Sequence, residues 1–118
     1  ERGSRNPDLL QVRERAERQL GTLGGGNHFI ELQSDGEYVW LMLHTGSRSF
    51  GKFICDHYHK RALRWCERYH TVLPDKELAF LALDSDDGRD YLIDMGFAMR
   101  FAEESRSRIA AACIAAMR

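Results

Sequence analysis

The chain has 118 residues, of which 43% are hydrophobic and 30% are charged, and its formal net charge at pH 7 is -1. This composition is ordinary for a soluble globular chain, and the length fits one domain or a part of one. The small net charge excludes a global basic field that would attract nucleic acid or an anionic membrane, although a local basic patch remains compatible with it. No apolar run approaches the roughly 20 residues that a membrane-spanning helix needs.

Three scattered cysteines without a CxxC pair favour reduced thiols in a cytoplasmic protein over a disulfide framework. The charged, polar N-terminus shows no secretory signal. The chain does not start with Met, and residues 109–118 still have a helical pattern with no stop signal. We therefore expect residues 1–118 to be a single segment of a longer protein.

The first element predicted is a helix over residues 7–20. Asn6 is a favourable N-cap, and Pro7 suits the first helical position because its missing N–H costs nothing there. Apolar residues recur at three- and four-residue steps, and Gly21 is a typical helix stop.

Two strands, over residues 29–33 and 38–44, come next. The connecting residues 34–37 contain Asp35-Gly36, which between apolar runs is a strong hairpin signal. Residues 39–43 are apolar throughout, which predicts that the second strand is buried on both faces.

Two helices and a short apolar run complete the predicted order. Residues 50–70 carry a helical apolar stripe that Ser47 or Ser49 can cap. Residues 78–83 read as a strand or a buried turn, and a long helix follows from about residue 87 to the end, with the acidic residues 84–87 at its positive N-terminus. The order of helix, two strands, helix, short strand and helix indicates an α+β fold.

The glycine-rich segment over residues 21–31 is the strongest chemical signal. Three consecutive glycines, residues 24–26, let the backbone approach a ligand closely, and Asn27, His28 and Glu31 follow. Asn27 offers an amide to a phosphate oxygen, or is simply an Asn tolerated in a turn. By strand alternation Glu31 points away from His28 and shares a face with Phe29, so a solvated strand carboxylate is the rival interpretation.

A second segment over residues 44–51 repeats this character. His44 ends an apolar strand and could approach His28 across the hairpin, where two imidazoles would supply part of a metal site. Two histidines alone cannot close such a site, and hydrogen-bonded strand-end histidines are the alternative. The Gly46–Ser49 stretch before a helix resembles an anion site with Arg48 as its cation, or a plain serine cap beside a surface arginine.

Other candidates have simpler explanations. His57 and His59 diverge by about 200° on a helix and should not share a metal. Asp84, Asp86 and Asp87 lack the spacing of a calcium loop.

Both motifs, in the right order, resemble those of the RtcB-type RNA ligases. Residues 19–31 resemble that family's glycine-rich Asn-His motif, and residues 44–48 resemble its next motif, His-Ser-Gly-Ser-Arg-Gly. Residues 73–81 and the long-helix pattern that includes Arg106 are similar as well.

The resemblance implies an activity and a set of roles. Members join RNA ends that carry a 2′,3′-cyclic phosphate or 3′-phosphate to 5′-hydroxyl ends, using GTP, manganese and a guanylylated histidine. It implies that His28 and His44 each bind one of two manganese ions, and that Arg48 holds an RNA phosphate. Asn27 would contact the GMP phosphate, and Glu31 would lie in the GMP pocket. An accessory activator is possible, and the sequence does not identify it.

Departures from the family pattern suggest a divergent branch. Thr45 stands where the family has Ser, Ser49 where it has Gly, and Ser105 where it has Asn. The family's bridging Cys and its Asp, its third metal His and its guanylylated His have no counterpart here, so we expect them in flanking sequence and expect this segment alone to be inactive. A non-catalytic metal- or phosphate-binding module and a metal-dependent hydrolase are the alternative functions.

Overall fold

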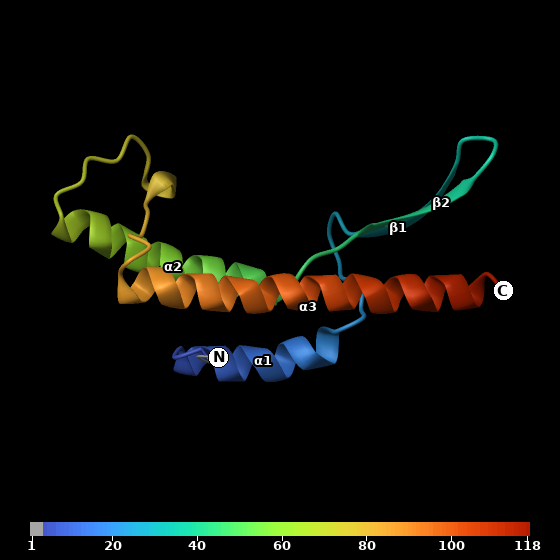
Figure 1. The fold of residues 1–118 in the computed structure, drawn as a ribbon, viewed down its shortest axis with the longest axis horizontal. Helices are drawn as coiled ribbons and strands as arrows, with labels where there is room; N and C mark the ends of the chain where they lie inside the picture. The colour runs from blue at the N-terminus through green and yellow to red at the C-terminus, as the bar shows by residue number, and fades with distance from the viewer. Residues whose placement is uncertain (1–3) are drawn as a thin grey trace.

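The computed structural model describes residues 4–118, which form three helices and one hairpin. In chain order the elements are α1 (Pro7–Gln19), β1 (Phe29–Ser34), β2 (Val39–His44), α2 (Ser49–Arg68), the 3-10 turn η1 (Lys76–Leu78) and α3 (Asp86–Ala116). Helix α3 is about 46 Å long at 1.5 Å per residue. Figure 1 shows α1 and α2 lying along this helix and the hairpin projecting away from it. The predicted α+β class is confirmed.

Helices α1 and α3 begin where their capping residues place them. The Asn6 side chain accepts a hydrogen bond from the Asp8 backbone N–H at 3.1 Å, and Pro7 is the first helical residue. Ser85 caps α3 by accepting from the Gly88 N–H at 3.0 Å, with Asp86 in the first turn. These side chains satisfy backbone donors that a helix start leaves unpaired.

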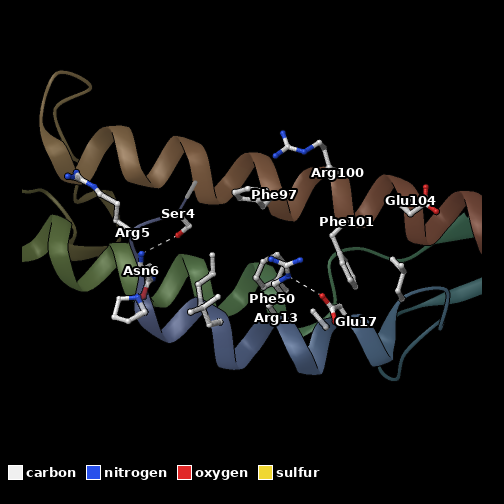
Figure 2. A pocket seen from close by; sticks show the side chains of 15 residues that line it. Ser4, Arg5, Asn6, Arg13, Glu17, Phe50, Phe97, Arg100, Phe101 and Glu104 are labelled. Atoms are coloured by element: carbon white, nitrogen blue, oxygen red, sulfur yellow. Dashed lines mark hydrogen bonds and ion pairs between the residues drawn. The ribbon is translucent and has the colours of Figure 1, made fainter. Parts of the chain in front are cut away.

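The core lies where α2 packs against both α1 and α3. Its central side chains are apolar: Leu9, Ala16, Phe50, Ile54, Tyr58 and Ala98. Most of the predicted stripes are therefore confirmed. Figure 2 shows the groove between α1 and α3, about 710 Å³ in volume, with Phe50, Phe97 and Phe101 on its wall.

The core also contains one buried polar pair, of which the predicted stripes include Tyr58 but not Asp94. Asp94 is fully buried, and its Oδ2 accepts a hydrogen bond from the Tyr58 hydroxyl at 2.6 Å. Burial and this carboxylate raise the pKa of Tyr58 well above its ordinary value. The pair ties the middle of α2 to α3 at a fixed register.

The hairpin is antiparallel, and Phe29 pairs with His44 while Ser34 pairs with Val39. Its turn is fastened by Asp35, whose Oδ1 accepts from the backbone N–H of Glu37 and Tyr38. The prediction that residues 39–43 are buried on both faces is wrong: Val39 is 69% exposed. An apolar run reports the preference of its side chains for burial, but Trp40 and Met42 are exposed as well, and only Leu41 and Leu43 are half-buried, in a strand that α3 contacts.

The prediction of a strand or buried turn over residues 78–83 is also wrong. The described chain has only η1 there, followed by an irregular segment in which Leu78, Phe80 and Leu83 are exposed. A strand needs a neighbouring strand for its backbone hydrogen bonds. The two-stranded sheet of this chain lies elsewhere, so the run has no such neighbour.

Candidate functional site

The two histidines predicted from the motifs lie together at the base of the hairpin. The ring centroids of His28 and His44 are 6.3 Å apart, with an angle of 38° between the rings. Phe29 stacks on His44 with a centroid distance of 5.2 Å. The antiparallel register produces this proximity, because it sets the start of β1 opposite the end of β2.

The glycine loop also touches the second motif, through Gly24. This residue has a φ of +94°, and a Cβ placed on it would lie 1.5 Å from Arg48 Nη1 and 2.8 Å from His28 Nδ1. Only a residue without a side chain fits there in this backbone conformation. Gly24 therefore lets the guanidinium and one imidazole of the site lie directly against the loop backbone.

Arg48 is held in an unusual backbone conformation. It is the residue that precedes α2, with φ 59° and ψ -145°, a region that costs a non-glycine residue about 1–3 kcal/mol. Its Nε and the Nδ1 of His28 are both buried without a hydrogen-bond partner within residues 4–118. Backbone strain and unsatisfied buried donors or acceptors are features that cluster at functional sites.

The sequence predicted Ser47 or Ser49 as the cap of α2, but neither occupies the N-cap position. The N-cap position belongs to Arg48, which makes no side-chain cap bond, and Ser49 is the first helical residue. Ser47 still contributes, because its hydroxyl accepts from the Gly51 N–H at 3.0 Å. The side chain of Arg48 is thereby left to face the glycine loop.

Three side-chain hydrogen bonds fix the loops of the site to each other and to α3. The Thr45 hydroxyl donates to the Leu23 carbonyl at 2.8 Å, and Arg106 Nη1 donates to the Thr45 carbonyl at 3.1 Å. The fully buried Ser105 accepts from the Gly21 N–H at 3.0 Å. The structural roles of these side chains were not anticipated from the sequence, although polar residues on the apolar stripe of α3 were the available signal.

Asn27 and Glu31 are exposed, and neither side chain has a partner in the described part of the chain. Glu31 pairs with Met42, so it lies on the sheet face of Phe29 and His44, as strand alternation predicted for Phe29. His57 instead belongs to α2, where it stacks with Phe53. The structure thus brings together His28, His44 and Arg48, while the side chains of Asn27 and Glu31 are exposed to solvent.

Within residues 4–118, no group of three or more His, Cys, Asp and Glu side chains is arranged to hold a metal ion. Among these residues, no helix is both long and apolar enough to cross a membrane.

Comparisons with known proteins agree with the motifs. The model of the family described as "tRNA-splicing ligase RtcB" matches residues 3–118. A protein of that name from Methanopyrus kandleri is 38% identical over 116 residues, which cover 81% of this chain and 12% of the relative. Its counterpart from Archaeoglobus fulgidus is 33% identical, covering 85% and 24%. The "RNA-splicing ligase RtcB" of Escherichia coli strain K12 is 38% identical, covering 75% and 22%.

The chain belongs to the RtcB family. It spans at most about a quarter of the length of these three relatives. The predicted membership is confirmed.

Proposed function

We propose that this chain is part of the catalytic centre of a cytoplasmic RNA ligase. The enzyme would join an RNA 2′,3′-cyclic phosphate or 3′-phosphate end to a 5′-hydroxyl end, using GTP and manganese, with GMP passing from a histidine to the RNA 3′-phosphate. The observation that carries the proposal is the convergence of His28, His44 and Arg48 at the base of the hairpin, in a chain of the RtcB family.

The donor set fits manganese. Imidazole nitrogen is a common ligand of divalent transition metals, and His28 Nδ1 is buried without a partner of its own. The ring centroids of His28 and His44 are 6.3 Å apart, so the two imidazoles face one region, where each would hold one of the manganese ions. Two bound metal ions would polarise a phosphoryl oxygen and orient the attacking and leaving groups.

The residues of the chain have distinct tasks in this proposal. Arg48, whose guanidinium lies against Gly24, would hold an RNA phosphate through its charge and its terminal N–H groups. Asn27 would contact the phosphate of GMP, and Glu31 would lie in the GMP pocket, on the face of the sheet that carries His44. The bonds from Ser105 and Arg106 keep the two loops in register, so that these groups meet one substrate.

The test uses the full-length protein that carries this segment, with His28→Ala and His44→Ala. Each change should weaken manganese binding, measured by calorimetry, by more than about 100-fold, because even partners in the outer shell of a metal are worth 10- to 100-fold. Transfer of labelled GMP to RNA should fall with it. His59→Ala, a half-buried histidine in the middle of α2, is the matched control.

Wild-type manganese affinity and GMP transfer in both histidine variants would refute the metal assignment. The dependence on GTP separates the ligase from a metal-dependent hydrolase, which would need none. A full-length protein that binds manganese but transfers no GMP would favour the non-catalytic module.

A further inference from the structure

The C-terminal half of α2 carries a basic face that the proposed ligation site does not use. Arg61, Arg64 and Arg68 follow each other at steps of three and four residues, so they project from one side of the helix, with Trp65 among them. These four residues and Asp87 of α3 line a pocket of about 250 Å³. We call Arg61, Arg64, Trp65, Arg68 and Tyr69 the arginine face.

One arginine of this face is fixed in place. Arg61 Nη1 forms an ion pair with Asp87 Oδ1 at 2.5 Å, and its Nε donates to His57 Nε2 at 3.1 Å. Burial and the neighbouring Arg61 lower the pKa of His57, so this imidazole is a neutral acceptor. Asp87, the one acidic side chain among those lining the pocket, is therefore already engaged by Arg61.

The other two arginines are available to a ligand. Arg64 and Arg68 are both exposed. Arg64 donates only to the Lys60 carbonyl of its own helix, at 3.4 Å, and Arg68 has no side-chain partner among the residues described. Arg64 and Arg68, which have no carboxylate partner within residues 4–118, thus lie beside the ion-paired Arg61. Together they form a local basic patch, which is compatible with a net charge of -1.

The same face carries an aromatic platform. Trp65 and Tyr69 lie with their ring centroids 4.6 Å apart, and Tyr69 is 57% exposed. Exposed aromatic rings beside arginines bind single-stranded RNA, because a base stacks on the ring while the guanidinium groups pair with backbone phosphates. The apolar residues Phe50, Ile54 and Tyr58 of α2 are buried in the core, which argues against an amphipathic helix lying on a membrane.

We propose that the arginine face binds single-stranded RNA several nucleotides away from the ends being joined. This inference rests on the proposed ligase function. Arg48 immediately precedes α2, whereas residues 61–68 lie 13 to 20 residues further along, which is about 20–30 Å at 1.5 Å per residue. At about 3.4 Å per stacked nucleotide, this distance corresponds to roughly six to nine nucleotides.

The test measures binding of the full-length protein to single-stranded RNA of about 15 nucleotides, by fluorescence anisotropy over a series of salt concentrations. Each phosphate contact to a single strand contributes about 0.7 to the slope of log K against log salt. Arg64→Gln combined with Arg68→Gln should therefore reduce the slope by about 1.4 and the affinity at about 0.1 M salt by about 25-fold. Tyr69→Ala should lower the affinity about 5- to 150-fold and leave the slope unchanged.

Two controls separate charge from folding and position. Arg64→Lys with Arg68→Lys keeps both charges and should retain the slope, and Arg15→Gln removes an exposed arginine of α1 and should change nothing. In ligation assays the Gln pair should raise KM for donors of about 12 nucleotides and leave KM for donors of about three nucleotides unchanged.

An unchanged affinity and slope in the Gln pair would overturn the inference, as would an equal loss in Arg15→Gln or a loss confined to binding of anionic vesicles. The two proposals fail separately. If the wild-type protein joins no RNA ends but the Gln pair still loses RNA affinity, RNA binding by the arginine face is supported and the proposed ligase function fails. If the protein joins RNA ends but its salt slope is unchanged in the Gln pair, the ligase function stands and RNA binding by the arginine face fails.

Discussion

Replacement of Gly24 by alanine tests the geometry of the site most directly. The new Cβ would lie 1.5 Å from Arg48 Nη1, whereas ordinary contacts begin near 3.4 Å, so the guanidinium must move by about 2 Å. Arg48 Nη1 is at the end of a flexible side chain, so the protein can fold around this change. The unfolding free energy should fall by about 1–2 kcal/mol, the cost of a left-handed backbone for an L-residue.

The effect on activity should be much larger than this loss of stability. Misplacing a catalytic group by 1 Å can cost about 100-fold in rate, so a 2 Å displacement of Arg48 should lower RNA joining by at least about 100-fold. Gly26→Ala is the matched control, because Gly26 has a φ of +88° and open space where its Cβ would be. It carries the same backbone cost and no contact with the site.

The assay is single-turnover joining by the full-length protein, together with urea unfolding of each variant. The reasoning is refuted if Gly24→Ala and Gly26→Ala lose the same activity, since the crowding of Arg48 would then be irrelevant. In an Arg48→Ala background, Gly24→Ala should cause a smaller further loss than it causes alone, because the crowding of the guanidinium is gone and only the 2.8 Å approach of the new Cβ to His28 Nδ1 remains.

Three further predictions concern the supports of the site. Ser105→Ala leaves the Gly21 N–H without its buried acceptor and should lower the unfolding free energy in urea by about 1–3 kcal/mol, whereas the exposed Ser107→Ala should cost less than about 0.5. Tyr58→Phe removes the donor to buried Asp94 and should cost about 1–3 kcal/mol. The pKa of Tyr58 is raised above its ordinary 10.0, so the stability that its hydroxyl adds is complete below pH 10 and is lost as the pH rises above it. If Tyr58→Phe and the wild type lose stability equally at alkaline pH, this prediction is contradicted. Hydrogen bonds from Tyr38, Trp40 and Glu37 lower the pKa of Asp35 from 3.8 to about 2. The hairpin turn should therefore loosen as the pH falls through that interval, because protonation removes the acceptor of these bonds. Trp40 fluorescence should report the change, and the Asp35→Ala variant should not show it.

The sequence predicted the hairpin and the proximity of His28 and His44 correctly because both depend on local chemistry. Asp35-Gly36 sets the turn, and an antiparallel register then brings His28 and His44 together with no help from distant residues. The same local rules located the start of α1 at its Asn6 cap and placed the start of α3 within one residue, from the acidic residues 84–87. Where a neighbour was needed, as for burial of residues 39–43 and a strand over 78–83, the prediction was wrong.

The family, the order of helices and hairpin, and the pair of histidines were therefore determined by the sequence alone. Only the tertiary structure decided that Arg48 lies against Gly24, that Ser105 and Arg106 tie the two loops to α3, and that Asp94 is buried. These contacts join residues 24 to 84 positions apart, and periodicity and capping say nothing about which distant elements meet. The packing of α2 against α1 and α3 decides which elements meet, because burial of the apolar stripes fixes the position and rotation of each helix. The polar groups on the helices then lie where this packing places them.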